Sequence, residues 1–116
     1  MSQAQPQGGG GRGLGGTTSV RVRLPAQLQV LASTRAELSV QVQGPVTQRT
    51  VLDALERLHP ALRGTVRDRA TARRRAFIRF FVGETDLSNA DPDDLLPTVV
   101  VAGTEALVVV GAMAGG

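Results

Sequence analysis

The sequence predicts a single α+β domain in which one main helix covers one face of an open β-sheet. Two segments with alternating apolar residues come first, one amphipathic segment follows them, and further strand-like segments complete the chain. With 116 residues, the chain is long enough for one modest core. Apolar residues make up 41% of the sequence, and only three of them are aromatic, so aliphatic side chains must build most of that core.

The chain divides into three parts by composition. Residues 1–18 are rich in glycine and show no apolar periodicity, which predicts a disordered N-terminal extension. The folded domain is expected over 19–111. Residues 112–116 consist of small side chains and end in two glycines, and we expect them to form a flexible tail.

The first half of the domain predicts two strands and the main helix. Residues 20–24 and 37–43 alternate apolar with polar side chains, which is the period of a half-buried strand. The segment 25–36 between them is expected to be a linker held to the core by Leu28 and Leu31. Thr47 is a plausible helix N-cap, and apolar residues then recur at helical spacing up to Pro60, which should end the helix near His59.

The second half predicts strands over 77–82 and 106–110, with a short strand over 98–101 between them. Residues 83–97 are polar and typical of turns. If Ile78, Phe80 and Val82 face the helix, alternate residues of both strands point to the opposite face. That face should then carry an apolar patch beside the tail, and we expect it to dock a partner through Phe77, Arg79, Phe81, Val108 and Val110.

Several classes of site are absent from the sequence. It has no cysteine, hence no disulfide, thiolate metal site or cysteine nucleophile. Its 13 basic residues are all arginine. No apolar stretch is typical of a secretory signal or a membrane span, so we expect a cytoplasmic protein that binds no membrane. Asp91, Asp93 and Asp94 lack calcium-loop spacing and are interpreted as a solvated turn, so no metal site is predicted.

Four segments and the C-terminus carry a resemblance to a known family: "SVRVRLPAQL" (19–28), "VTQRTVLDALERLHPALR" (46–63), "FIRFFVGETDL" (77–87) and "VAGTEALVVVGAMAGG" (101–116). The chain resembles the ubiquitin-like sulfur carriers, which include the small subunit of molybdopterin synthase, the thiamine-pathway carrier and a carrier that feeds a cysteine synthase. The resemblance implies a β-grasp fold, with a mixed sheet of four to five strands whose first and last strands are parallel neighbours.

The resemblance also implies a non-catalytic role. An E1-like adenylyltransferase or sulfurtransferase would use ATP to adenylate the carboxylate of Gly116, and the resulting thiocarboxylate would donate sulfur to a synthase subunit. No cofactor would be bound permanently. Met113, Ala114 and Gly115 would extend the reach of the tail, and glycine suits a terminus that must follow a narrow channel. The chain would serve molybdopterin, thiamine or cysteine-type biosynthesis, in one variant as the small subunit of a sulfurtransferase.

Two other functions remain as alternatives, of which only the first depends on Gly116. A ubiquitin-like modifier would be activated in the same way and then attached through Gly116 to lysines of other proteins. A small basic RNA-binding module is suggested by "RRRAFIRFF", although Arg79 stands where such a strand would carry its next stacking aromatic, and no nucleic-acid partner is predicted. The arginines of the segment 63–76 suit either an acidic partner or a solvated loop: Arg63, Arg67, Arg69, Arg73, Arg74 and Arg75.

Overall fold

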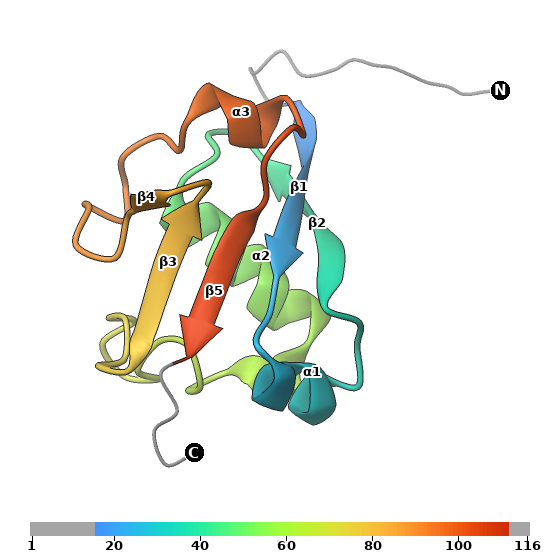
Figure 1. Ribbon diagram of the computed structural model, residues 1–116, viewed down its shortest axis with the longest axis vertical. Helices are drawn as coiled ribbons and strands as arrows, with labels where there is room; N and C mark the ends of the chain where they lie inside the picture. Colours follow the sequence, from blue (N-terminus) through green and yellow to red (C-terminus); the bar gives the residue numbers. More distant parts are fainter. Residues whose placement is uncertain (1–15, 112–116) are drawn as a thin grey trace, which may run out of the picture.

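The computed structural model describes residues 16–111, which form a five-stranded sheet with one long helix across one face (Figure 1). The strand order is β2-β1-β5-β3-β4. The elements, in chain order, are β1 (Thr17–Arg23), α1 (Ala26–Ala32), β2 (Glu37–Gln43), α2 (Gln48–Leu58), the 3-10 turn η3 (Pro60–Leu62), β3 (Ile78–Val82), β4 (Thr85–Asp86), α3 (Thr98–Val101) and β5 (Leu107–Gly111).

The sheet is mixed. β1 and β2 are antiparallel, β5 is antiparallel to β3, and β5 runs parallel to β1, with Val22 opposite Leu107. The first and last strands are therefore neighbours in the middle of the sheet. The α+β class and the β-grasp arrangement expected from the resemblance are confirmed.

The main helix begins and ends as the sequence predicts. The hydroxyl of Thr47 accepts a hydrogen bond from the backbone N–H of Thr50 at 3.1 Å, and the Thr50 hydroxyl accepts one from the backbone N–H of Thr47 at 2.9 Å. This reciprocal cap satisfies amide groups that the first helical turn leaves unpaired. The apolar stripe of α2 packs on the sheet face that carries Val20, Val40, Phe80 and Val109.

Two segments differ from their predicted structure. The expected linker 25–36 contains the short helix α1, in which Leu28 is buried but Leu31 is 49% exposed, so only one of the two leucines holds it to the core. The expected strand over 98–101 is the helix α3. Its β-branched residues favour a strand, but Pro97 starts a helical turn there and Val100 alone is buried beneath it.

Two further features differ from the prediction. The folded domain is expected to begin at Ser19, but β1 begins at Thr17, because Thr17 and Thr18 pair with Gln43 and Val42 of β2. The remainder of the expected N-terminal extension, 1–15, lies outside the described residues. The turn-rich segment after β3 holds the short strand β4, which the positive φ of Gly83 brings back alongside Val82 in a tight hairpin.

Candidate functional site

The candidate site is built where β5 ends. This strand lies between β1 and β3, and its last residue, Gly111, pairs with Ile78 at the start of β3. The predicted reactive tail follows Gly111 directly, and its residues Met113 to Gly116 lie outside the described part of the chain. The described fold therefore fixes the point from which the tail departs, at the end of a central strand.

An apolar strip runs along β3 and β5 on the sheet face opposite α2. Phe81 pairs with Val108, and Arg79 pairs with Val110. Their neighbours Ile78, Phe80, Val82, Leu107 and Val109 are buried on the helix side, so the alternation predicted for both strands is confirmed. Val110 is 39% exposed, and Phe77, just before β3, is 66% exposed. That these residues bind a partner remains a prediction.

Charged pairs flank the strip on both sides. Toward β2, Glu37 accepts from Arg21 Nε at 2.8 Å and from Arg23 Nη1 at 3.2 Å. The hydrogen bond from Arg21 is the main reason that the pKa of Glu37 lies below its ordinary value. Arg21 also donates to the carbonyl of Gly103 at 2.8 Å, which ties the loop after α3 to β1. The outer face therefore has an apolar centre and a polar rim, which is the pattern of a protein interface.

On the other flank, Arg79 is held by the β4 hairpin. Its guanidinium lies 2.7 Å from Asp86, and the backbone N–H of Ser88 donates to the same carboxylate at 2.8 Å. Hydrogen bonds from the Ser88 side chain and backbone, followed by that from Arg79, lower the pKa of Asp86 to about 2. The Ser88 hydroxyl in turn accepts from the backbone N–H of Phe80 at 2.9 Å. Arg79 is thus pre-positioned at the rim of the strip.

The Arg-rich segment is a compact hairpin in which the six arginines have different roles. Arg67 is only 7% exposed and lies 2.8 Å from Asp53 and 3.0 Å from Glu56, both on α2. Burial acts to lower the pKa of Arg67, but the hydrogen bonds that Arg67 donates to Glu56 and Asp53 outweigh it and leave that pKa raised. Arg74 reaches toward β3 and the segment after β4.

These different roles of the arginines were not predicted from the sequence. From composition alone the six arginines form one positively charged segment. In the structure, Arg67 and Arg74 instead make the hydrogen bonds that hold the hairpin to the rest of the domain. A signal was available in the spacing on α2, because Asp53 and Glu56 are three residues apart and therefore share a helix face. The remaining four arginines of the hairpin, namely Arg63, Arg69, Arg73 and Arg75, are exposed.

The other ionisable groups show no catalytic arrangement within 16–111. No group of three or more His, Asp or Glu side chains there is placed to hold a metal ion. In the acidic turn, Asp91 accepts from the backbone N–H of Asp93, and Asp93 pairs with Arg49. His59 caps the C-terminal end of α2 through its backbone N–H, which donates to Leu55. Across the same residues, no helix has the length and apolar character to cross a bilayer.

Comparison with known proteins relates the chain to three solved structures. No protein-family model matches the sequence, and no curated protein matches it. SAMP1 from Haloferax volcanii superposes with a TM-score of 0.65 at 23% identity, covering 84% of this chain and 99% of that one. The small archaeal modifier protein 1 from Methanosarcina acetivorans gives 0.63 at 20% identity, covering 86% and 98%.

The third structure is the BexX/CysO complex from Amycolatopsis orientalis. One of its chains superposes with a TM-score of 0.62 at 20% identity, covering 84% of this chain and 99% of that one. The alignments span nearly the whole of each neighbour, so the likeness extends over the complete domain. The resemblance to the ubiquitin-like sulfur carriers and modifiers is therefore confirmed at the level of the fold, and the chain has the β-grasp architecture of these proteins.

Proposed function

We propose that this chain is a sulfur carrier whose Gly116 carboxylate is adenylated by an E1-like enzyme and converted to a thiocarboxylate. The thiocarboxylate then donates its sulfur in molybdopterin, thiamine or cysteine-type biosynthesis. The observation that carries the proposal is the combination of a β-grasp fold with a last strand that ends at Gly111 beside an exposed apolar strip, four residues before the first glycine of the Gly115-Gly116 pair.

The chemistry explains why the chain needs no catalytic group of its own. A carboxylate is a poor electrophile until its oxygen attacks the α-phosphate of ATP and pyrophosphate leaves. A sulfide nucleophile then attacks the carbonyl carbon of the acyl adenylate, AMP departs, and the carboxylate oxygen is replaced by sulfur. The partner enzymes hold ATP and the sulfur donor. The carrier contributes the reactive end and the surface that positions it.

The described residues support a role in which the carrier supplies a docking surface and the partner enzymes supply the catalytic groups. The polar rim of Arg21, Arg23 and Arg79 fixes the orientation of a docked partner, and the strip of Phe81, Val108 and Val110 supplies apolar area to bury. A fully extended chain spans roughly 3.3 Å per residue, so the five residues that follow Gly111 in the sequence are enough to reach from this face into a neighbouring channel.

A second candidate is a protein modifier attached through Gly116 to lysines of other proteins. The specific observation in its favour is the likeness to the small archaeal modifier protein 1. Both functions use the same activation, so they differ only in the fate of the activated carboxylate.

Intact-mass analysis of the protein from its native host separates the two. We expect a species heavier by the exchange of one oxygen for sulfur, and we expect it to be absent when Gly116 is deleted. Covalent adducts to other proteins, with no sulfur-bearing species, would support the modifier instead. An unchanged mass under conditions in which the biosynthetic pathway is active would reject both.

A further inference from the structure

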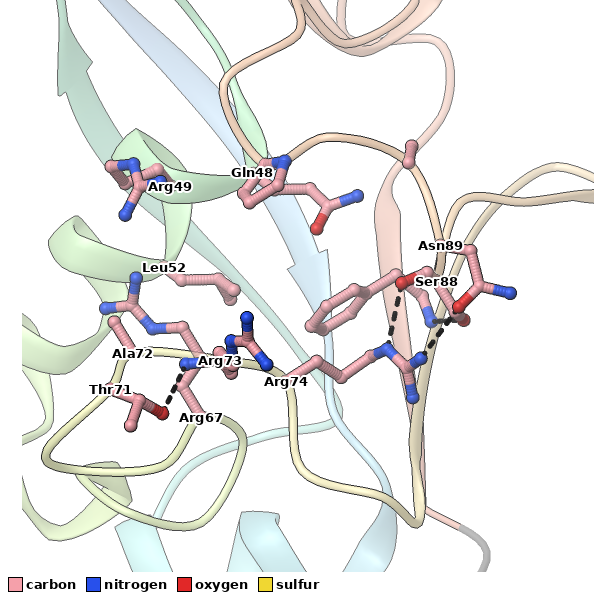
Figure 2. A pocket seen from close by; sticks show the side chains of 13 residues that line it. Gln48, Arg49, Leu52, Arg67, Thr71, Ala72, Arg73, Arg74, Ser88 and Asn89 are labelled. Atoms are coloured by element: carbon pink, nitrogen blue, oxygen red, sulfur yellow. Dashed lines mark hydrogen bonds between the residues drawn. The ribbon is translucent and has the colours of Figure 1, made fainter.

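A cavity of about 560 Å³ lies on the helix side of the sheet, away from the docking strip. It is a partly open cavity bordered by the first turns of α2, the Arg-rich hairpin and the segment that follows β4 (Figure 2). Leu52 and Phe80 contribute apolar side chains to its lining. This volume lies in the range of small-molecule binding sites and is larger than the volume of a single inorganic ion.

Four arginines line this cavity, and no acidic residue does: Arg49, Arg67, Arg73 and Arg74. Two of these charges are balanced from outside the cavity. Arg49 pairs with Asp93, with Nη2 to Oδ2 at 3.0 Å, and Arg67 pairs with Asp53 and Glu56. The other two, Arg73 and Arg74, have no carboxylate partner among the described residues.

Arg74 carries its charge into a half-buried position. It donates to the backbone carbonyls of Ser88 at 2.9 Å and Ile78 at 2.8 Å, and to Asn89 Oδ1 at 3.0 Å, as the dashed lines toward Ser88 and Asn89 in Figure 2 show. All of these acceptors are neutral. A guanidinium that is hydrogen-bonded but not charge-compensated leaves a positive potential in a partly desolvated site.

The hairpin holds Arg73 beside Arg74 in a fixed backbone conformation. The backbone N–H of Asp68 donates to the carbonyl of Arg73 at 2.7 Å, and the N–H of Arg73 donates to the hydroxyl of Thr71 at 3.2 Å. Ala72, between Thr71 and Arg73, adopts a φ of 61°, a left-handed conformation that is unfavourable for a residue other than glycine. The Arg73 side chain itself has no hydrogen-bond or ion-pair partner within 16–111.

We propose that this cavity binds a small phosphorylated molecule. Its phosphate group pairs with the guanidinium of Arg73, its remaining part lies against Leu52 and Phe80, and Arg74, whose guanidinium already donates to Ser88, Ile78 and Asn89, contributes positive potential. Guanidinium groups recognise phosphate through paired, charge-assisted hydrogen bonds. The docking strip lies on the opposite face of the sheet. The carrier is therefore able to hold this ligand while a partner enzyme occupies the strip.

The experiment measures binding of inorganic pyrophosphate and of ADP to the full chain by isothermal titration calorimetry. Arg73→Gln removes one cavity guanidinium. Arg75→Gln is the matched control, because Arg75 is exposed on the same hairpin, gives the same change in net charge and does not line the cavity. Arg73→Gln is expected to weaken both ligands about tenfold, whereas Arg75→Gln changes either affinity by less than about twofold.

Three results would overturn the proposal: no saturable binding of either phosphate, equal weakening by the two variants, or binding of succinate without binding of pyrophosphate. Equal weakening would show attraction by net charge alone. Unchanged thermal unfolding midpoints confirm that both variants are folded. Deleting Gly116 is expected to leave pyrophosphate binding unaltered, so this inference and the proposed sulfur chemistry succeed or fail separately.

Discussion

Phe81 of β3 and Val108 of β5 are cross-strand partners, and both side chains lie on the face of the sheet that α2 leaves uncovered. On the same face, Val108 is also opposite Arg23 of β1. The pair therefore lies at the centre of the outer face. Val108 is three residues before Gly111, where β5 ends. This arrangement of an apolar centre with charged residues on both flanks favours a partner whose orientation is set by polar contacts at the rim. Burial of the apolar residues at the centre then provides most of the binding affinity.

Truncating the centre of this strip should weaken activation without unfolding the domain. For Phe81→Ser, we expect the KM of the activating enzyme for the carrier to rise about tenfold or more with little change in kcat, since a central aromatic is a common interface hot spot. Pyrophosphate release at varied carrier concentration measures this. Leu58→Ser is the control, because Leu58 is 53% exposed on the helix side. Equal effects of the two changes would contradict the assignment of the docking face.

Stability in acid should depend on Asp86. Its pKa is lowered from 3.8 to about 2 in the folded chain, so the unfolded chain binds its proton more readily as the pH falls. The stabilisation is complete above the ordinary pKa and is lost as the pH falls from about 4 toward 2. Urea midpoints measured across this range should fall less steeply for Asp86→Asn than for the wild type. Identical slopes would show that the hydrogen bonds of Ser88 and Arg79 do not stabilise the carboxylate in solution.

The buried guanidinium of Arg67 makes Glu56 a structural residue. Glu56→Gln should lower the free energy of unfolding by about 2 kcal/mol, because it removes one of the two carboxylates that compensate a buried charge. Urea denaturation measures the loss. Glu84→Gln provides the same charge change at an exposed site on the β3–β4 turn and should cost less than about 0.5 kcal/mol. A loss for Glu56→Gln no larger than that for the control would mean that Asp53 alone suffices.

The cap of α2 should be worth a measurable part of the stability. Thr47→Ala removes the hydroxyl that accepts from Thr50 and should destabilise the domain by about 1 kcal/mol. Thr47→Ser keeps the hydroxyl and should recover most of that loss. If serine and alanine destabilise equally, the methyl group of the largely buried Thr47, rather than its hydrogen bond, is what the domain requires.

The strands and the main helix could be predicted because one dominant signal fixed each of them. Alternation placed Val20 and Val22 on the helix side, and Thr47 and Pro60 bounded the helical stripe. The orientation of β3 and β5, and hence the exposed strip, also came from alternation. These signals are local, and tertiary contacts reinforce rather than oppose them.

The two short helices were not predictable in the same way. In α1 only Leu28 is buried while Val30 is 80% exposed, so the segment shows no amphipathic period. In α3 the run Val99–Val101 favours a strand by propensity, but the sheet positions beside β1, β5 and β3 are already occupied, and the helical turn after Pro97 buries Val100 instead. The arginine-lined cavity likewise depends on contacts between α2 and a distant hairpin.

The most direct test of the account is the mass of the carrier after incubation with its activating enzyme, ATP and a sulfur donor. The wild type should gain the mass expected when one carboxylate oxygen is exchanged for sulfur. The variant lacking Gly116, folded to the same unfolding midpoint, should gain nothing. A carrier that remains unmodified under these conditions, or a truncated variant that is modified to the same extent, would contradict the claim that this end of the chain is the reactive group.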